Sequence, residues 1–138
     1  MTDLERAKSI LNEGHTCVLV KNDEVIIYDK TGIAPMMDVL ANKINVNDFS
    51  VADKIVGKAV AMLMALAKVK NVYAEVISYG AIKVLEENSI SYSYKVLTDK
   101  IINRSGTDIC PMEKTVANIK DLHKAYEALK LKLESLTK

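Results

Sequence analysis

The sequence lacks the features that mark exported, disulfide-bonded and membrane-spanning proteins. Its 138 residues include two cysteines, Cys17 and Cys110, which are too few for a disulfide framework. The longest apolar run is shorter than the roughly 18 residues that a membrane span requires. The first residues, MTDLERAK, carry no signal-peptide pattern. We therefore expect a cytoplasmic protein with reduced thiols and no membrane partner.

An excess of charge of either sign is also absent. Lys and Arg total 19, Asp and Glu total 18, and the formal net charge is +1. Without a global positive field, the chain has no long-range attraction for the phosphate backbone of a nucleic acid. We expect no nucleic-acid partner, and any anion site must come from a local group of residues.

The signatures of metal and cofactor sites are missing as well. Two histidines, His15 and His123, and the two cysteines are scattered without the CxxC, HxE or HExxH spacing of zinc sites. Neither GxGxxG nor GxxxxGKS/T occurs, so a dinucleotide-binding loop and a P-loop are both unsupported. We expect no bound metal and no cofactor.

The composition that is present suits one globular domain. Hydrophobic residues make up 49% and charged residues 27% of the chain, enough to bury a core. No linker, repeat or low-complexity tract is visible, so residues 1–138 are expected to form a single domain.

Helix-like and strand-like periods alternate along the first half of the chain. A helix is predicted over residues 3–12, with Thr2 as its N-cap. The runs TCVLV and EVIIY, joined by KND, predict an antiparallel hairpin. Pro35 is expected in the first turn of the next helix. The run VADKIVGKAVAMLMALA, residues 51–67, then predicts a long apolar helix capped by Ser50.

The second half predicts a strand-helix-strand unit, with strands over 72–77 and 90–97 and a helix over 81–87. Such crossovers join parallel strands, and the second strand has the wetter face of a strand near a sheet edge. Pro111 is expected to start another helix, and residues 121–136 carry the leucine stripe of a closing amphipathic helix. The predicted class is α/β.

The first candidate site is the leading end of the predicted central helix. Asp53 and Gly57 are four residues apart, and so are Lys54 and Lys58, so a helix would place each pair on one face. The unpaired N–H groups and positive dipole end of a helix bind anions, and lysines would reinforce a preference for phosphate. The alternative is that these residues have structural roles only. Asp53 would interact favourably with the helix dipole, Gly57 would allow close packing, and the lysines would be solvated.

The second candidate site is the segment NRSGTDICPME, residues 103–113. Cys110 precedes Pro111 at a predicted helix start, where the dipole lowers a thiol's pKa, and Glu113 completes the first turn. The alternative is that Cys110 is a small buried hydrophobe. A turn at Thr107 could present N–H groups to an anion, and Arg104 could contact phosphate or carboxylate.

Three segments together resemble a small prokaryotic family, a domain of unknown function whose fold is similar to that of cytidine deaminase. They are VADKIVGKAVA, VYAEVIS and GTDICPME, and the match spans nearly the whole chain. The resemblance implies a three-layer α/β/α arrangement with a mixed sheet.

The resemblance also implies that the zinc chemistry of deaminases is missing. Active deaminases carry H-x-E at one helix start and P-C-x-x-C at the next. In this chain the first motif falls on Val51-Ala52-Asp53 and the second near Ser78-Tyr79-Gly80-Ala81, where there is no thiol. The cleft at the helix starts, which in that superfamily receives a base or nucleoside, is expected to persist.

We therefore expect a zinc-free, deaminase-like domain that binds a nucleotide or related phosphorylated small ligand at the Asp53 helix. Asp53 would contact base or ribose, or act as a nucleophile or modification acceptor, and Cys110 is the second candidate catalytic residue. The candidate ligand-binding residues are Lys54, Gly57, Lys58, Ser78, Asn103, Arg104, Thr107 and Glu113. The alternatives are a non-catalytic interaction or homo-oligomerisation domain, which pairs through the strand at Tyr92, and an enzyme with Cys110 as nucleophile.

Overall fold

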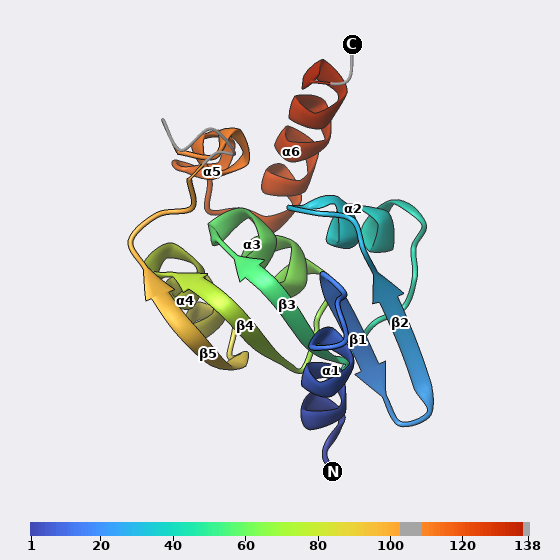
Figure 1. The fold of residues 1–138 in the computed structure, drawn as a ribbon. Coiled ribbons are helices and arrows are strands. Elements are labelled where there is room, and N and C mark those ends of the chain that lie inside the picture. Colours follow the sequence, from blue (N-terminus) through green and yellow to red (C-terminus); the bar gives the residue numbers. More distant parts are fainter. Residues whose placement is uncertain (103–108, 137–138) are drawn as a thin grey trace.

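The computed structural model describes residues 1–102 and 109–136 and has an α/β fold (Figure 1). Five strands form one mixed sheet in the order β2-β1-β3-β4-β5. The elements, in chain order, are α1 (Asp3–Leu11), β1 (Cys17–Lys21), β2 (Glu24–Tyr28), α2 (Ala34–Ala41), β3 (Ser50–Val56), α3 (Lys58–Leu66), β4 (Asn71–Ser78), α4 (Tyr79–Glu87), β5 (Ser91–Thr98), α5 (Pro111–Val116) and α6 (Leu122–Leu136).

The N-terminal predictions are confirmed. Thr2 caps α1, because its hydroxyl accepts a hydrogen bond from the Glu5 N–H at 3.1 Å. Strands β1 and β2 pair antiparallel, and Asn22 takes a left-handed conformation (φ 54°) in the turn between them. Pro35 lies in the first turn of α2.

The prediction of one helix over residues 51–67 is wrong. Ser50–Val56 is the central strand β3, which pairs antiparallel with β1 and parallel with β4. Helix α3 begins only at Lys58, with Gly57 in an extended conformation at its N-cap. A strand covered on both faces reads as a continuous apolar run, which periodicity alone does not separate from a buried helix.

The strand-helix-strand unit is confirmed. Strand β4 pairs parallel with β5, and α4 connects them, although α4 begins two residues earlier than predicted because Ser78 caps it. Strand β5 lies at one edge of the sheet, as its polar alternation predicts. Pro111 begins α5, and α6 closes the described chain.

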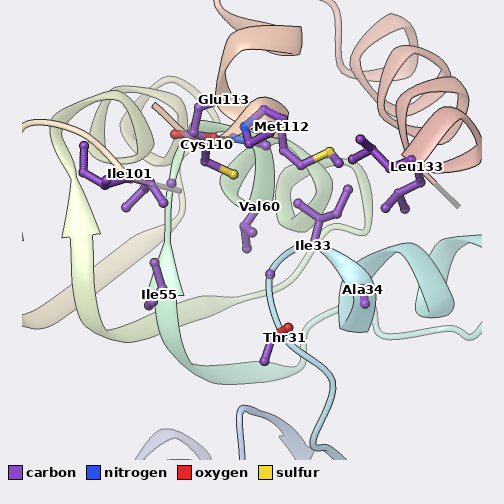
Figure 2. Close-up of a pocket in the computed structure, with 16 residues that line it drawn as sticks. Thr31, Ile33, Ala34, Ile55, Val60, Ile101, Cys110, Met112, Glu113 and Leu133 are labelled. Carbon is purple, nitrogen blue, oxygen red and sulfur yellow. Dashed lines mark hydrogen bonds between the residues drawn. The ribbon is translucent and has the colours of Figure 1, made fainter. Parts of the chain in front are cut away.

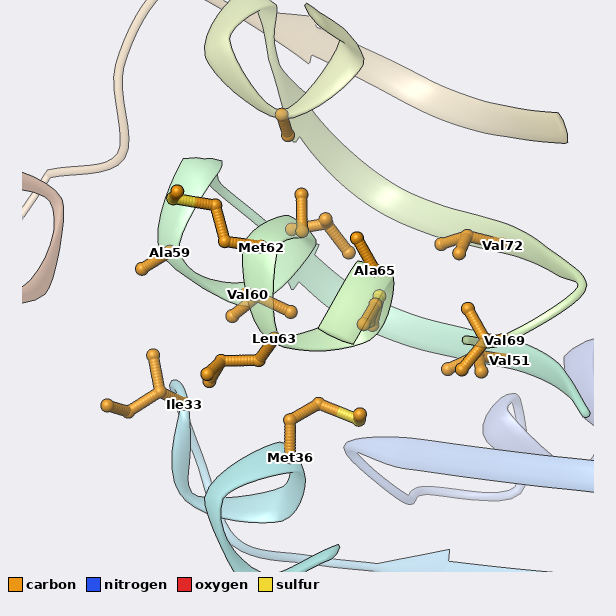
Figure 3. Close-up of a cluster of buried hydrophobic side chains, with 14 of the residues drawn as sticks. Ile33, Met36, Val51, Ala59, Val60, Met62, Leu63, Ala65, Val69 and Val72 are labelled. Carbon is orange, nitrogen blue, oxygen red and sulfur yellow. The ribbon is translucent and has the colours of Figure 1, made fainter. Parts of the chain in front are cut away.

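Helices cover both faces of the sheet (Figure 1). Helix α1 packs on one face through Ala7 and Leu11, which contact Val18, Val20 and Ala52. Helices α2, α3 and α4 pack on the other face, where the larger core lies. Figure 3 shows Leu63 of α3 on the side that faces Ile33 and Met36, which belong to the segment that leads into α2 and to α2 itself.

Helix α3 is buried along nearly its whole length, since α5 and α6 cover the side away from the sheet. Among the described residues, the structure contains no helix with the length and hydropathy to span a bilayer.

Candidate functional site

A cavity of about 690 Å³ lies beside the carboxyl end of β3 (Figure 2). Five parts of the chain meet there: the segment before α2, the junction of β3 and α3, the segment after β5, the start of α5 and the end of α6. The lining residues are Thr31, Gly32, Ile33, Ala34, Ile55, Gly57, Ala59, Val60, Ile101, Ile102, Cys110, Pro111, Met112, Glu113, Leu133 and Leu136.

The carboxylate of Glu113 binds the N-terminus of α3. Its Oε1 accepts a hydrogen bond from the Lys58 N–H, and its Oε2 accepts one from the Ala59 N–H, each at 2.8 Å. The negative charge meets the positive end of the helix dipole, and two N–H groups that have no acceptor within the helix are satisfied. The anion expected at this helix start is therefore a side chain of the same protein.

Gly57 makes this contact possible. A Cβ atom at this position would overlap Glu113 Oε1 and lie 2.7 Å from both Glu113 Cδ and Ile101 Cγ1. The sequence predicted that a ligand approaches the bare backbone at Gly57, but in the structure the group that lies there is the Glu113 carboxylate. Any larger residue would push the carboxylate away from the helix.

Cys110 lies in the same cavity as Glu113. Its N–H donates to the Ile101 carbonyl at 2.9 Å, which fixes the backbone where it enters α5. The side chain is half-buried, and Figure 2 shows its sulfur on the side of Val60, toward the interior of the cavity. The thiol is therefore open to a molecule in the cavity.

Asp53 is elsewhere, and its predicted position at a helix start is wrong. It lies inside β3, is 5% exposed, and sits opposite Cys17 in the β1–β3 ladder. Its Oδ1 accepts from the Ile55 N–H at 3.3 Å, and its Oδ2 has no hydrogen-bond partner among the described residues. Burial raises the pKa of Asp53 from its usual 3.8 to about 7. Asp53 is not among the lining residues of the cavity.

Cys17 is a chemically unusual residue that the sequence did not single out. It is fully buried, and burial followed by the negative charge of Asp53 raises the pKa of its thiol well above the usual range. The hairpin pattern predicts Cys17 on β1. Its neighbour Asp53 could not be predicted, because residues 51–56 were expected to be helical.

The two lysines of the predicted helix face diverge. Lys54 lies on β3, where its Nζ is 3.8 Å from Glu75 Oε2. Lys58 lies in the first turn of α3 and its Nζ donates to the Ala117 carbonyl at 3.1 Å. The pair four residues apart does not form one cationic face, because the helix begins after Lys54.

The remaining predicted site residues have structural roles or lie outside the described residues. Ser78 caps α4, since its Oγ accepts from the Ala81 N–H at 3.1 Å. Asn103, Arg104 and Thr107 lie outside the described residues. Within residues 1–102 and 109–136, no group of three His, Cys, Asp or Glu side chains is placed to hold a metal ion.

Most of the cavity wall carries no signal in the sequence. Ile33 precedes α2, Ile55 lies in β3 and Val60 in α3, and Leu133 comes from the far end of α6. Each lies in an apolar pattern that is explained by core packing alone. No local signal distinguishes a residue that lines a cavity from one that fills the core.

Comparisons with known proteins place the chain in a family. Residues 6–133 match the family model TM1506, described as a domain of unknown function (DUF1893), and the chain belongs to this family. The structure is similar to the crystal structure of a DUF1893 family protein (TM1506) from Thermotoga maritima. The sequences are 25% identical, the match covers 96% of this chain and 91% of that one, and the TM-score is 0.85. No curated protein matches the chain.

Proposed function

We propose that this member of the DUF1893 family binds a small, largely apolar molecule in the 690 Å³ cavity and holds it against Cys110 and Glu113. The observation that carries the proposal is the cavity itself, an apolar chamber with a thiol and a carboxylate at one end. Ligand sites typically measure roughly 300–1,000 Å³ and combine apolar walls with a few placed polar groups. In open α/β sheets such sites lie at the carboxyl ends of strands, as this one does beside β3.

The lining residues favour an uncharged ligand or one that donates hydrogen bonds. None of the described lining residues is a lysine, arginine or histidine, and the charged group among them is the Glu113 carboxylate. That carboxylate already occupies the α3 N-terminus, so a phosphate entering here would face a negative charge. The geometry thus supports the base-like part of the expected nucleotide ligand better than its phosphate.

A cytidine-deaminase-like fold, which we propose from the sequence resemblance, would favour the same class of ligand. The mixed sheet and the helices that follow β3 and β4 agree with the architecture which that resemblance implies. The two helix starts carry Gly57-Lys58-Ala59 and Ser78-Tyr79-Gly80-Ala81, without a zinc ligand in either. We propose a deaminase-like fold in which a planar heterocycle is bound without zinc, with Asp53 buried away from it.

Ligand titration of two matched variants tests the proposal. Cytosine, cytidine and cytidine 5′-phosphate are added to the protein, and thermal unfolding and backbone amide resonances are followed. Ala34 lines the cavity at the start of α2, and Ala41 is exposed at the end of the same helix. Ala34→Trp should fill the cavity and abolish the response, whereas Ala41→Trp should keep it.

The three probes carry increasing size and charge, so their order is informative. A ligand at about 100 times its Kd stabilises the folded state by about 2.7 kcal/mol, which is readily measured. We expect the uncharged probes to bind more tightly than the phosphate. The amides of Val60 and Cys110, which line this cavity, should respond more strongly to the uncharged probes than to cytidine 5′-phosphate. The opposite order at these amides, or an equal response of these amides in both tryptophan variants, would contradict the proposed site.

A second candidate function is self-association through the outer edge of β5. The strand is eight residues long, lies at the sheet edge, and exposes Tyr94 by 42% and Val96 by 48%. An edge strand of this kind presents unpaired N–H and C=O groups that can pair with a second copy. Light scattering over a range of concentrations tests it: a mass that is monomeric throughout would remove this candidate, and Val96→Lys should weaken any dimer.

A further inference from the structure

A second cavity, about 340 Å³ in volume, lies on the other side of the first turn of α3. It is bounded by α3, α4 and the turn between α5 and α6. The lining residues are Lys58, Met62, Gly80, Lys83, Val84, Glu87, Asn88, Ile119, Lys120 and Leu122. The lining is therefore a mixture of apolar and charged side chains.

Positive charge is concentrated at this cavity. Lys58 comes from α3, Lys83 from α4 and Lys120 from the turn before α6, and Glu87 is the acidic residue among the lining side chains. Lys83 and Lys120 are exposed and make no ion pair with the described residues. Three ammonium groups against one carboxylate give a local excess of positive charge in a chain that is nearly neutral.

One of the three ammonium groups is held in place by the fold. Lys58 Nζ donates to the carbonyl of Ala117, the residue that follows α5, at 3.1 Å, so this ammonium group is oriented by the fold. Gly80 belongs to the first turn of α4, where the backbone N–H groups lack acceptors within the helix and that of Ala81 donates to Ser78 Oγ. A fixed cation beside such a turn lowers the cost of binding an anion.

We propose that this cavity binds the phosphate group of a small phosphomonoester, whose apolar part lies on Met62, Val84 and Leu122. A doubly charged oxyanion matches three lysines better than a singly charged carboxylate does, and lysine binds phosphate as a mobile point charge. The phosphate expected from the sequence thus belongs to the Lys58 side of α3, away from Asp53 and away from Glu113.

The two cavities are separate, so this proposal does not depend on the proposed function. Gly57, Ala59 and Val60 face the large cavity, whereas Lys58 and Met62 face the small one. A ligand of one cavity should therefore perturb different backbone amides from a ligand of the other. Gly80 and Lys83 report the small cavity, and Val60 and Cys110 report the large one.

The test is a titration with phenyl phosphate, inorganic phosphate and benzoate. Binding is followed by calorimetry and by backbone amide resonances. The wild-type chain is compared with the double variant Lys83→Gln/Lys120→Gln and with a control, Lys70→Gln/Lys95→Gln, which removes two exposed lysines outside the cavity. All four lysines are exposed, so both variants are expected to fold.

We expect phenyl phosphate to bind more tightly than inorganic phosphate or benzoate and to shift the amides of Gly80 and Lys83. Each lost lysine should weaken binding about fivefold, so the double variant should lose about 25-fold while the control stays within about twofold. Raising the salt concentration should also weaken binding. The proposal is overturned if phenyl phosphate fails to bind up to about 10 mM, or if both double variants bind it equally.

Discussion

The buried carboxyl group of Asp53 makes the stability of the fold depend on pH in a defined direction. Burial raises the pKa of Asp53 from 3.8 to about 7, so the folded chain holds this proton more tightly than the unfolded chain. The resulting stability is complete below the pKa of the unfolded chain and is lost as pH rises through about 7. A shift of about three pH units corresponds to about 4 kcal/mol of unfolding free energy.

Urea unfolding between about pH 4 and pH 8 measures this loss. In this window Asp53 should contribute a slope of up to about −1.4 kcal/mol per pH unit to the wild-type curve. Asp53→Asn has the shape of the protonated residue but cannot ionise, so its curve should lack that slope and lie above the wild type at pH 8. Asp23→Asn, at an exposed position of the β1–β2 turn, is the matched control and should follow the wild type.

Parallel curves for the wild type and Asp53→Asn would refute the reasoning. They would mean that the Asp53 carboxyl group reaches water in the folded chain, or that it keeps its ordinary pKa inside β3. A loss of slope in Asp23→Asn would point instead to the net charge of the chain as the cause.

Three further predictions concern the described contacts. Gly57→Ala should lower the unfolding free energy by about 2 kcal/mol by displacing Glu113 from α3, and it should cost less in a chain that carries Glu113→Ala. Equal costs in the two backgrounds, measured by urea unfolding, would show that the two residues are not coupled. Iodoacetamide should modify Cys110 and spare Cys17 in the folded chain, because Cys17 is fully buried, and peptide mass spectrometry would expose the opposite pattern. Ser78→Ala should cost about 1 kcal/mol through the lost cap of α4, and an unchanged unfolding midpoint would contradict that role.

The elements with a short-range signal were predictable from the sequence. The turn at Asn22 indicated the hairpin, and Pro35 and Pro111 indicated two helix starts. Two strand-like runs around a helix-like one predicted the crossover between β4 and β5. In each case the residues that decide the structure are neighbours in the chain. Local rules are sufficient there.

The central segment was mispredicted because its pattern fits two structures. Val51, Ile55 and Val56 are β-branched and favour a strand, yet an apolar run with residues three and four apart also fits a helix. Gly57 was the available signal, since a glycine between two apolar runs is typical of a strand-to-helix junction rather than a helix interior. Its role was assigned to a ligand instead.

The candidate site was predictable only in part, because its central contact is non-local. Glu113 reaches Lys58 across 55 positions of sequence. Cys110 and Glu113 could be placed together, since they share a helix start, but their meeting with Gly57 could not. That contact depends on how α5 packs against α3, and a single sequence does not show which distant segments pack together.

The contact of the Glu113 carboxylate with the N-terminus of α3 also has a consequence for folding during synthesis. Helix α3 forms the middle of the fold, yet the counter-charge for its leading end is supplied by a residue synthesised much later, at position 113. A nascent chain that ends before that position leaves two amide hydrogens of its central helix to the solvent. The last quarter of the polypeptide thus supplies a contact inside the fold. Removing it would leave the N-terminus of α3 without its carboxylate.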